Sequence, residues 1–285
     1  MAEFSAIPWT DHTMNFWIGC TEASEPGCAT CYARELDKRY QFGVPPEQAK
    51  ANRAAGVAPH WGAGAPRHRT AESNWRKPIR WDQQAAAKGR VYKVFTSSLS
   101  DLFDNEVDAR WRAEAWAVIK RTANLRWIVL TKRVPNIKKM LPADWGAGYP
   151  NVGLVASVVT SDELLRDAPR LLAVPARWHG FSIEPQVERI VLPGYFAGHA
   201  GSIWVITGGD SAQPSSGIEP RRYDVEWARS LVTAGRVADN VHVFVKQLGA
   251  RPMNAPPQTD VYAGENVDEW PEDVRVRNFP PELLR

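Results

Sequence analysis

Three cysteines are the residues of this chain whose types and spacing most directly indicate chemistry. Cys20, Cys28 and Cys31 lie within twelve positions of a 285-residue sequence that has no other cysteine. A C-x-x-C pair clamps a metal, and thiolates suit zinc or an iron–sulfur cluster. Structural zinc would need a fourth ligand, for which His12 is the nearest candidate. The alternatives are therefore a zinc site, a three-cysteine 4Fe–4S cluster with one open iron, and plain burial of the thiols.

Short apolar runs indicate the strands that must position these cysteines. Nearly continuous runs are typical of strands buried on both faces of a parallel sheet, and they cover residues 14–19, 91–98, 125–132, 151–159, 177–185, 202–209 and 241–247. Helical periodicity covers 108–123, 161–174 (with Ser161 as the expected cap) and 224–237, and another helix is expected from Tyr32 onward. This alternation predicts an α/β protein of parallel βα units, either barrel-like or open and doubly wound.

Polar residues follow almost every predicted strand. The carboxyl ends of parallel strands lie at one edge of the sheet, where sites form. The residues that we expect at this edge are Thr96, Ser97, Ser98, Thr131, Lys132, Arg133, Ser157, Ser182, Glu184, Gly208, Gly209, Asp210, Lys246 and Gln247. Any one of them could simply cap the next helix, but their shared position favours a single site.

Net charge and hydropathy limit the classes of protein to which this chain can belong. The net charge of +3 does not by itself indicate a nucleic-acid binder, and we expect no membrane span and no signal peptide, hence a cytoplasmic protein. We expect one barrel over residues 1–250 that contains an insert at 41–90 after the first strand. Residues 251–285 are expected to form a C-terminal tail packed on the barrel.

Several motifs together resemble a known superfamily. The chain is similar to radical S-adenosylmethionine (SAM) proteins, and more closely to the three-cysteine-motif proteins common in phages and prophages, a family related to spore photoproduct lyase. The matching stretches, in family order, are NFWIGCTEASEPGCATCYARE, WRKPIRW, VFTSSLSDLFDNEV, WIVLTKR, SIEP, WVITGGDS and FVKQLG. The seven-residue gap between Cys20 and Cys28 is longer than the usual superfamily gap of three, but is similar to the pattern of the phage family.

The resemblance implies a fold, cofactors and a reaction. It implies a partial parallel (βα)6–7 barrel in which Cys20, Cys28 and Cys31 hold a 4Fe–4S cluster, SAM binds the open iron, and reductive cleavage yields a 5′-deoxyadenosyl radical. By position, Thr96, Ser97, Ser98 and Asp101 would hold the methionyl amino group or a ribose hydroxyl. Gly208, Gly209 and Asp210 would lie near adenine, and Ser157 would face the ribose or the substrate. Lys132 and Glu184 are the candidate catalytic residues, and Lys132 and Arg133 could instead bind a carboxylate or a phosphate.

The substrate is indicated less directly. Residues 66–81 interleave basic and aromatic residues, a composition suited to phosphates and bases. With the resemblance to a DNA-lesion lyase, this segment predicts a nucleobase in DNA as the substrate. The candidate DNA contacts are Arg67, Arg69, Trp75, Arg76, Arg133 and Lys246. A solvated loop is the alternative for this segment.

Two other functions stay open. The protein could be a radical enzyme acting on a peptide or small metabolite, or a non-enzymatic zinc or cluster protein. An electron donor such as flavodoxin or ferredoxin is the expected partner.

Overall fold

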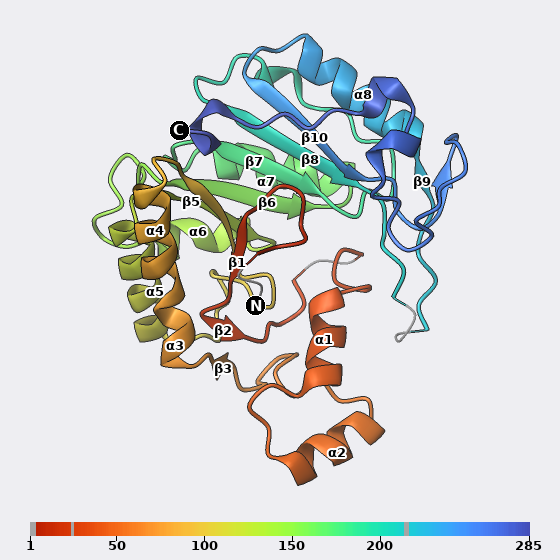
Figure 1. Cartoon of the computed structure of the whole chain (residues 1–285). Coiled ribbons are helices and arrows are strands. Elements are labelled where there is room, and N and C mark those ends of the chain that lie inside the picture. Colours follow the sequence, from red (N-terminus) through yellow and green to blue (C-terminus); the bar gives the residue numbers. More distant parts are fainter. Residues whose placement is uncertain (1–3, 24–25, 214–216) are drawn as a thin grey trace. The chain divides into compact units, whose positions relative to one another are not determined.

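Seven parallel strands form the main sheet of the protein. The structure is a computed structural model (Figure 1) that describes residues 4–23, 26–213 and 217–285. The chain divides into two compact units, Met1–Gly153 and Leu154–Arg285. The expected α/β class with a parallel sheet is confirmed. The expected domain boundaries stay a prediction.

The first unit has the strand order β1-β4-β5. The pairings β1–β4 and β4–β5 are both parallel, and helices lie between these strands in the sequence. Asp108 caps the long helix α5 by accepting a hydrogen bond from the Arg110 N–H. The elements of this unit are β1 (His12–Met14), β2 (Trp17–Ile18), α1 (Tyr32–Tyr40), α2 (Pro46–Ala54), β3 (His68–Arg69), α3 (Glu72–Trp75), α4 (Lys77–Ala87), β4 (Tyr92–Thr96), α5 (Ala109–Arg121), β5 (Leu125–Thr131) and α6 (Ile137–Met140).

The second unit has the strand order β6-β7-β8-β10, again all parallel. Trp178, Trp204 and Phe181 are almost completely buried in its core. Burial of such large rings is the main favourable contribution to folding. Its elements are β6 (Val152–Val158), α7 (Ser161–Leu172), β7 (His179–Ile183), β8 (Ile203–Gly208), β9 (Tyr223–Asp224), α8 (Val225–Arg236), β10 (Val241–Gln247) and β11 (Pro252–Met253).

The first predicted strand is where sequence and structure differ most. Residues 14–19 were expected to form one strand, but β1 ends at Met14 and β2 pairs antiparallel with β3 in a separate small sheet. Asn15 explains the break. Its buried side chain donates to Ser98 Oγ (2.8 Å) and accepts from the Leu99 N–H (2.7 Å). The prediction of one strand over 14–19 was therefore wrong.

The other predicted strands are confirmed within a few residues, and α1 begins at Tyr32 as expected. The predicted cap of α7 was off by one residue. Thr160, not Ser161, caps this helix, because the Thr160 side chain accepts from the Glu163 N–H.

The C-terminal segment packs within the second unit. The Val245 N–H donates to the Val276 carbonyl oxygen (2.8 Å), and the Asn278 N–H donates to the Val243 carbonyl oxygen (2.9 Å). These bonds satisfy backbone groups along β10, whose edge would otherwise be open. In the described part of the chain, no helix has the length and apolar character needed to cross a membrane.

Candidate functional site

The backbone at Cys20 is held from three directions. The Gly19 N–H donates to the Leu99 carbonyl oxygen (3.0 Å), the Cys20 N–H to the His60 carbonyl oxygen (3.2 Å), and the Gly62 N–H to the Cys20 carbonyl oxygen (2.9 Å). Gly19 has a φ of +112°, and a Cβ atom there would lie 2.4 Å from the His60 carbonyl oxygen. Only glycine fits this position, so the chain enters Cys20 along a fixed path.

Cys28 and Cys31 lie in one tight turn that leads into α1. The Cys31 N–H donates to the Cys28 carbonyl oxygen (3.2 Å), and Cys31 occupies the N-cap position of the helix. Cys28 is buried, and Cys31 packs beside Ile18 and Leu99. Burial raises the pKa of the Cys31 thiol. Without a compensating cation, this environment therefore disfavours a thiolate.

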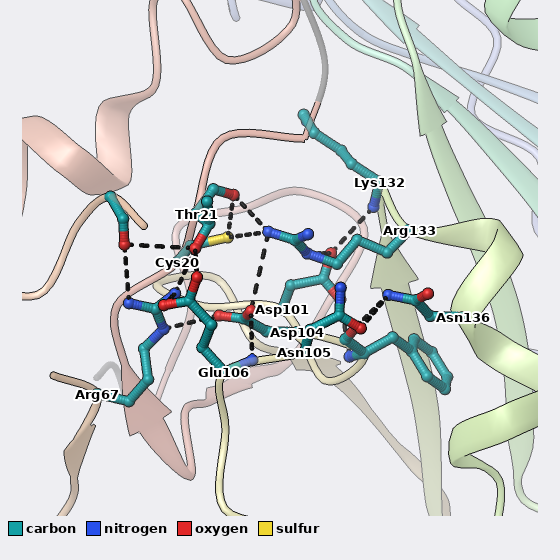
Figure 2. Close-up of polar contacts among 12 residues, drawn as sticks. Cys20, Thr21, Arg67, Asp101, Asp104, Asn105, Glu106, Lys132, Arg133 and Asn136 are labelled. Carbon is teal, nitrogen blue, oxygen red and sulfur yellow. Dashed lines mark hydrogen bonds and ion pairs between the residues drawn. The ribbon is translucent and has the colours of Figure 1, made fainter. Parts of the chain in front are cut away.

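Arg133 is the cationic neighbour of Cys20 (Figure 2). Its Nη2 atom donates to Cys20 Sγ (3.7 Å) and to the Thr21 carbonyl oxygen. Burial raises the pKa of the Cys20 thiol to about 12, the nearby Asp101 carboxylate adds to this effect, and Arg133 opposes it. The Cys20 sulfur thus lies in a buried environment with charged groups on one side.

Asp101 connects the loops that follow β4 and β5. Its carboxylate accepts from Thr131 Oγ1 (2.8 and 2.9 Å), from the Lys132 N–H (3.1 Å) and from the Phe103 N–H (2.9 Å). Burial raises its pKa, while these bonds and the Arg133 charge act in the opposite direction. The Lys132 side chain extends away from this cluster in Figure 2.

Asp104 is a second buried carboxylate in the same loop. Arg67 Nε lies 2.7 Å from Asp104 Oδ2, and Arg133 Nη2 lies 3.9 Å from Asp104 Oδ1. Arg67 also donates to Thr21 Oγ1 (2.6 Å), and its side chain is 2% exposed. A guanidinium with these partners fixes the loops around Cys20, so in this structure Arg67 does not offer a free phosphate contact.

The predicted cofactor residues Thr96 and Ser97 have buried hydroxyls. Neither Oγ atom has a hydrogen-bond partner among the described residues, and the same is true of Ser100. Ser97 has a φ of +68°, which is unusual for a residue other than glycine. Ser98 is different, because its Oγ accepts from Asn15 and its carbonyl oxygen accepts from Tyr32 Oη (2.8 Å). Unpaired buried hydroxyls beside a strained backbone are features that often accompany ligand sites.

In the second unit, the structure pairs two predicted residues. Lys246 Nζ lies 3.1 Å from Glu184 Oε1, and Ser182 Oγ donates to Glu184 Oε2 (3.1 Å). Ser157 lies beside Ser182 in the register of β6 and β7. The carboxyl ends of β6, β7 and β10 thus contribute to one polar cluster. This is the arrangement expected at the edge of the sheet where the parallel strands end.

The predicted adenine residues in the same unit have protein neighbours of their own. A Cβ atom on Gly209 would lie 2.7 Å from Tyr223 Cβ, and Gln247 Nε2 donates to the Gly209 carbonyl oxygen (2.7 Å). A Cβ atom on Gly208 would lie 3.3 Å from Glu184 Oε1. Asp210 pairs with Arg221, whose Nε lies 2.6 Å away. Close packing within the unit accounts for these glycines, and a role in adenine binding stays a prediction.

The basic segment 66–81 is only partly exposed. Trp75 is buried against Phe16, and the Arg69 guanidinium lies 3.9 Å over the Trp75 ring while pairing with Glu72 and Glu114. Arg76 is exposed. Of the predicted DNA contacts in this segment, the structure therefore leaves Arg76 the most accessible.

The donor set fits an iron–sulfur cluster in its chemistry. Three thiols, two of them in one turn, lie in the same unit as buried hydroxyls that lack partners. The described residues contain no group of three or more histidine, cysteine, aspartate or glutamate side chains placed to hold a metal. Residues 24–25, between Cys20 and Cys28, lie outside the described part of the chain.

Sequence reasoning missed several residues that build this site. Asp104, Asp37 and His60 are buried and have no distinctive spacing from the cysteines. Arg112 donates to the Leu102 (2.9 Å) and Asp104 (2.6 Å) carbonyl oxygens and so holds the loop after β4. The only available signal was the density of acidic residues in DLFDNE, which follows the serine pair.

Together these features define a parallel α/β protein in which Cys20 and Cys31 lie beside the loop that follows β4. The chain belongs to the family described as "protein of unknown function (DUF5131)", which matches residues 4–272. No curated protein matches this chain.

Solved structures of spore photoproduct lyase are similar to this chain. A cysteine-to-serine mutant has a TM-score of 0.45 and 14% identity, covering 76% of this chain and 62% of that chain. The lyase complexed with dinucleoside spore photoproduct has a TM-score of 0.43 and 14% identity, covering 71% and 57%. A double mutant with bound AdoMet and dinucleoside spore photoproduct has a TM-score of 0.42 and 11% identity, covering 84% and 57%. This chain therefore spans less than two thirds of the length of these proteins.

Proposed function

We propose that this protein is a radical SAM enzyme in which Cys20, Cys28 and Cys31 hold a 4Fe–4S cluster. With SAM bound and one electron from a low-potential donor such as flavodoxin or ferredoxin, such a cluster would supply reductive cleavage of SAM to methionine and a 5′-deoxyadenosyl radical, which would take a hydrogen atom from the substrate. The observation that carries the proposal is that Gly19, next to Cys20, and Cys31 both contact Leu99, two residues after Ser97 with its unpaired buried hydroxyl. The motif order described above supports the same assignment.

The residues of the first unit have distinct proposed tasks. We assign Thr96 and Ser97 to hydrogen bonds with polar groups of SAM, because a ligand would satisfy hydroxyls that lack partners among the described residues. Asp101 is engaged with Thr131 and the Lys132 N–H, so we assign it to holding the loops. Lys132 remains a candidate for contact with a carboxylate or a phosphate.

In the second unit, Glu184 and Lys246 are the proposed substrate-binding residues. Their ion pair is partly exposed, with side-chain exposures of 14% for Glu184 and 22% for Lys246. A polar substrate group would compete with this ion pair for either charged group.

Anaerobic preparation separates the alternatives. Wild-type protein should contain four irons and four sulfides, by the composition of the proposed cluster, and should release 5′-deoxyadenosine when given dithionite and SAM. Stoichiometric zinc without iron would refute the proposal. An intact cluster that neither binds nor cleaves SAM, with candidate substrates present, would leave an electron-transfer or structural role.

We further propose DNA as the substrate. The support is the exposed basic side of the 66–81 segment, where Arg76 and Arg80 are exposed and Lys77 is half-buried. Each phosphate contact lowers the slope of log affinity against log salt concentration by about 0.9 on duplex DNA. Undetectable DNA binding at low salt would favour a peptide or small-metabolite substrate.

A further inference from the structure

Arg133 and Cys20 are 113 residues apart in the sequence, yet the Arg133 guanidinium donates directly to the Cys20 sulfur. The same Nη2 atom donates to the Thr21 carbonyl oxygen. Figure 2 shows the guanidinium next to the Cys20 sulfur, with the Asp101 and Asp104 carboxylates also near it. A cation is thus directed at one of the three thiols.

The position of Arg133 is fixed at both ends of the residue. Its backbone N–H donates to Thr131 Oγ1 (2.8 Å), and Thr131 in turn donates to Asp101. At the other end, Arg133 Nε lies 3.9 Å from Asp101 Oδ2 and Nη2 lies 3.9 Å from Asp104 Oδ1. The Arg133 side chain is 11% exposed, so water competes weakly for its donors.

We propose that Arg133 is a positioning residue that sets the reduction potential of the cluster through its hydrogen bond to Cys20. This inference rests on the proposed function. A hydrogen bond from a cationic donor to a ligating sulfur stabilises the extra negative charge of the reduced cluster and raises its potential. Cys20 would therefore be electronically distinct from Cys28 and Cys31, neither of which has a guanidinium contact among the described residues.

The test compares Arg133→Gln and Arg133→Lys with Lys132→Gln by redox titration of the cluster, with iron and sulfide measured in each sample. Lys132→Gln removes the same charge one residue away, and the charge of Lys132 acts on Cys31. We expect the reduced-to-oxidised ratio at a fixed potential to fall at least tenfold in Arg133→Gln, which corresponds to about 59 mV for a one-electron couple. Arg133→Lys keeps the charge but loses the planar fork, so its shift should be intermediate.

Each outcome decides between the proposals. An intact cluster in Arg133→Gln with an unchanged potential, or with a shift no larger than that of Lys132→Gln, would overturn the role of Arg133 and leave the proposed function standing. Loss of the cluster from both Arg133 variants would assign Arg133 to cluster retention and would also overturn it. If Arg133→Gln loses the cluster but Arg133→Lys keeps it, the test rests on Arg133→Lys. A lowered reduction potential in Arg133→Lys supports the role of Arg133, and an unchanged potential overturns it. Wild-type protein without any cluster would overturn the proposed function, and this inference with it.

Discussion

The Asp37 carboxylate accepts hydrogen bonds from both the backbone N–H and Nδ1 of His60, each at 2.9 Å. Asp37 lies on α1, which begins directly after Cys31, and the His60 carbonyl oxygen accepts from the Cys20 N–H. One buried pair therefore connects the chain at Cys20 to the helix at Cys31.

Disrupting this pair should loosen the cysteine segment. We expect Asp37→Ala to lower the free energy of unfolding by about 1–3 kcal/mol, because it leaves two buried donors of His60 unpaired. The variant should also retain less iron than wild type. Urea unfolding and iron analysis measure these effects, and Glu47→Ala, on the exposed helix α2, is the control. Wild-type stability and iron content in Asp37→Ala would show that the pair does not organise the site.

Single cysteine substitutions test the ligand set. Cys20→Ala, Cys28→Ala and Cys31→Ala should each reduce bound iron to near zero, because two thiolates do not hold a 4Fe–4S cluster stably. Iron, sulfide and visible absorption are the measurements, with circular dichroism to check folding. Full iron content in any folded single variant would remove that cysteine from the ligand set.

The unpaired hydroxyls predict which variants affect SAM. Thr96→Val and Ser97→Ala should each weaken SAM binding about 2- to 10-fold, the range for one lost hydrogen bond of about 0.5–1.5 kcal/mol. Iron content should not change. Isothermal titration with anaerobic protein measures the affinity, and Ser73→Ala, at an exposed position on α3, is the control. An unchanged affinity in both variants would place SAM elsewhere.

Arg76 tests the proposed DNA surface. Arg76→Ala should reduce the magnitude of the salt slope of DNA affinity by about 0.9 if it neutralises one phosphate. Arg121→Ala removes another exposed arginine, at the end of α5, and should leave the slope unchanged. Equal slopes for wild type and Arg76→Ala, with DNA binding retained, would move the contact to another basic residue.

The His179 ring predicts acid sensitivity of the second unit. His179 Nε2 lies 2.9 Å from the Val174 carbonyl oxygen, and Nδ1 lies 3.3 Å from His199 Nε2. Burial is the main cause that lowers its pKa from 6.5 to about 4. Because the unfolded chain takes up this proton first, stability is full above about pH 6.5 and falls as the pH drops toward 4. The loss is at most about 3 kcal/mol.

Unfolding by urea between pH 7 and pH 4.5 checks this expectation. His179→Gln should show a smaller loss of stability over this range than wild type, whereas His242→Gln, which alters a less buried ring, should change it less. The same pH dependence in wild type and His179→Gln would assign the acid sensitivity to other groups.

The sequence by itself was sufficient for the positions of most strands and for the candidate ligands. Apolar runs such as those that became β5, β6 and β10 are local signals, because strands covered on both faces are nearly continuous in apolar residues. The cysteine cluster is likewise visible from spacing alone. The division of residues 14–19 into β1 and β2 is not visible from local sequence. It depends on hydrogen bonds between Asn15 and the distant residues Ser98 and Leu99.

Only the tertiary structure decided which charged residues act on which partners. Arg67 and Arg76 belong to one basic segment, yet Arg67 is buried against Asp104 while Arg76 is exposed. In the same way, nothing in the sequence relates Arg133 to Cys20. The physical reason is that the partner of a charge is set by burial and by the approach of distant loops, whereas sequence patterns report only on neighbours within the same strand or helix.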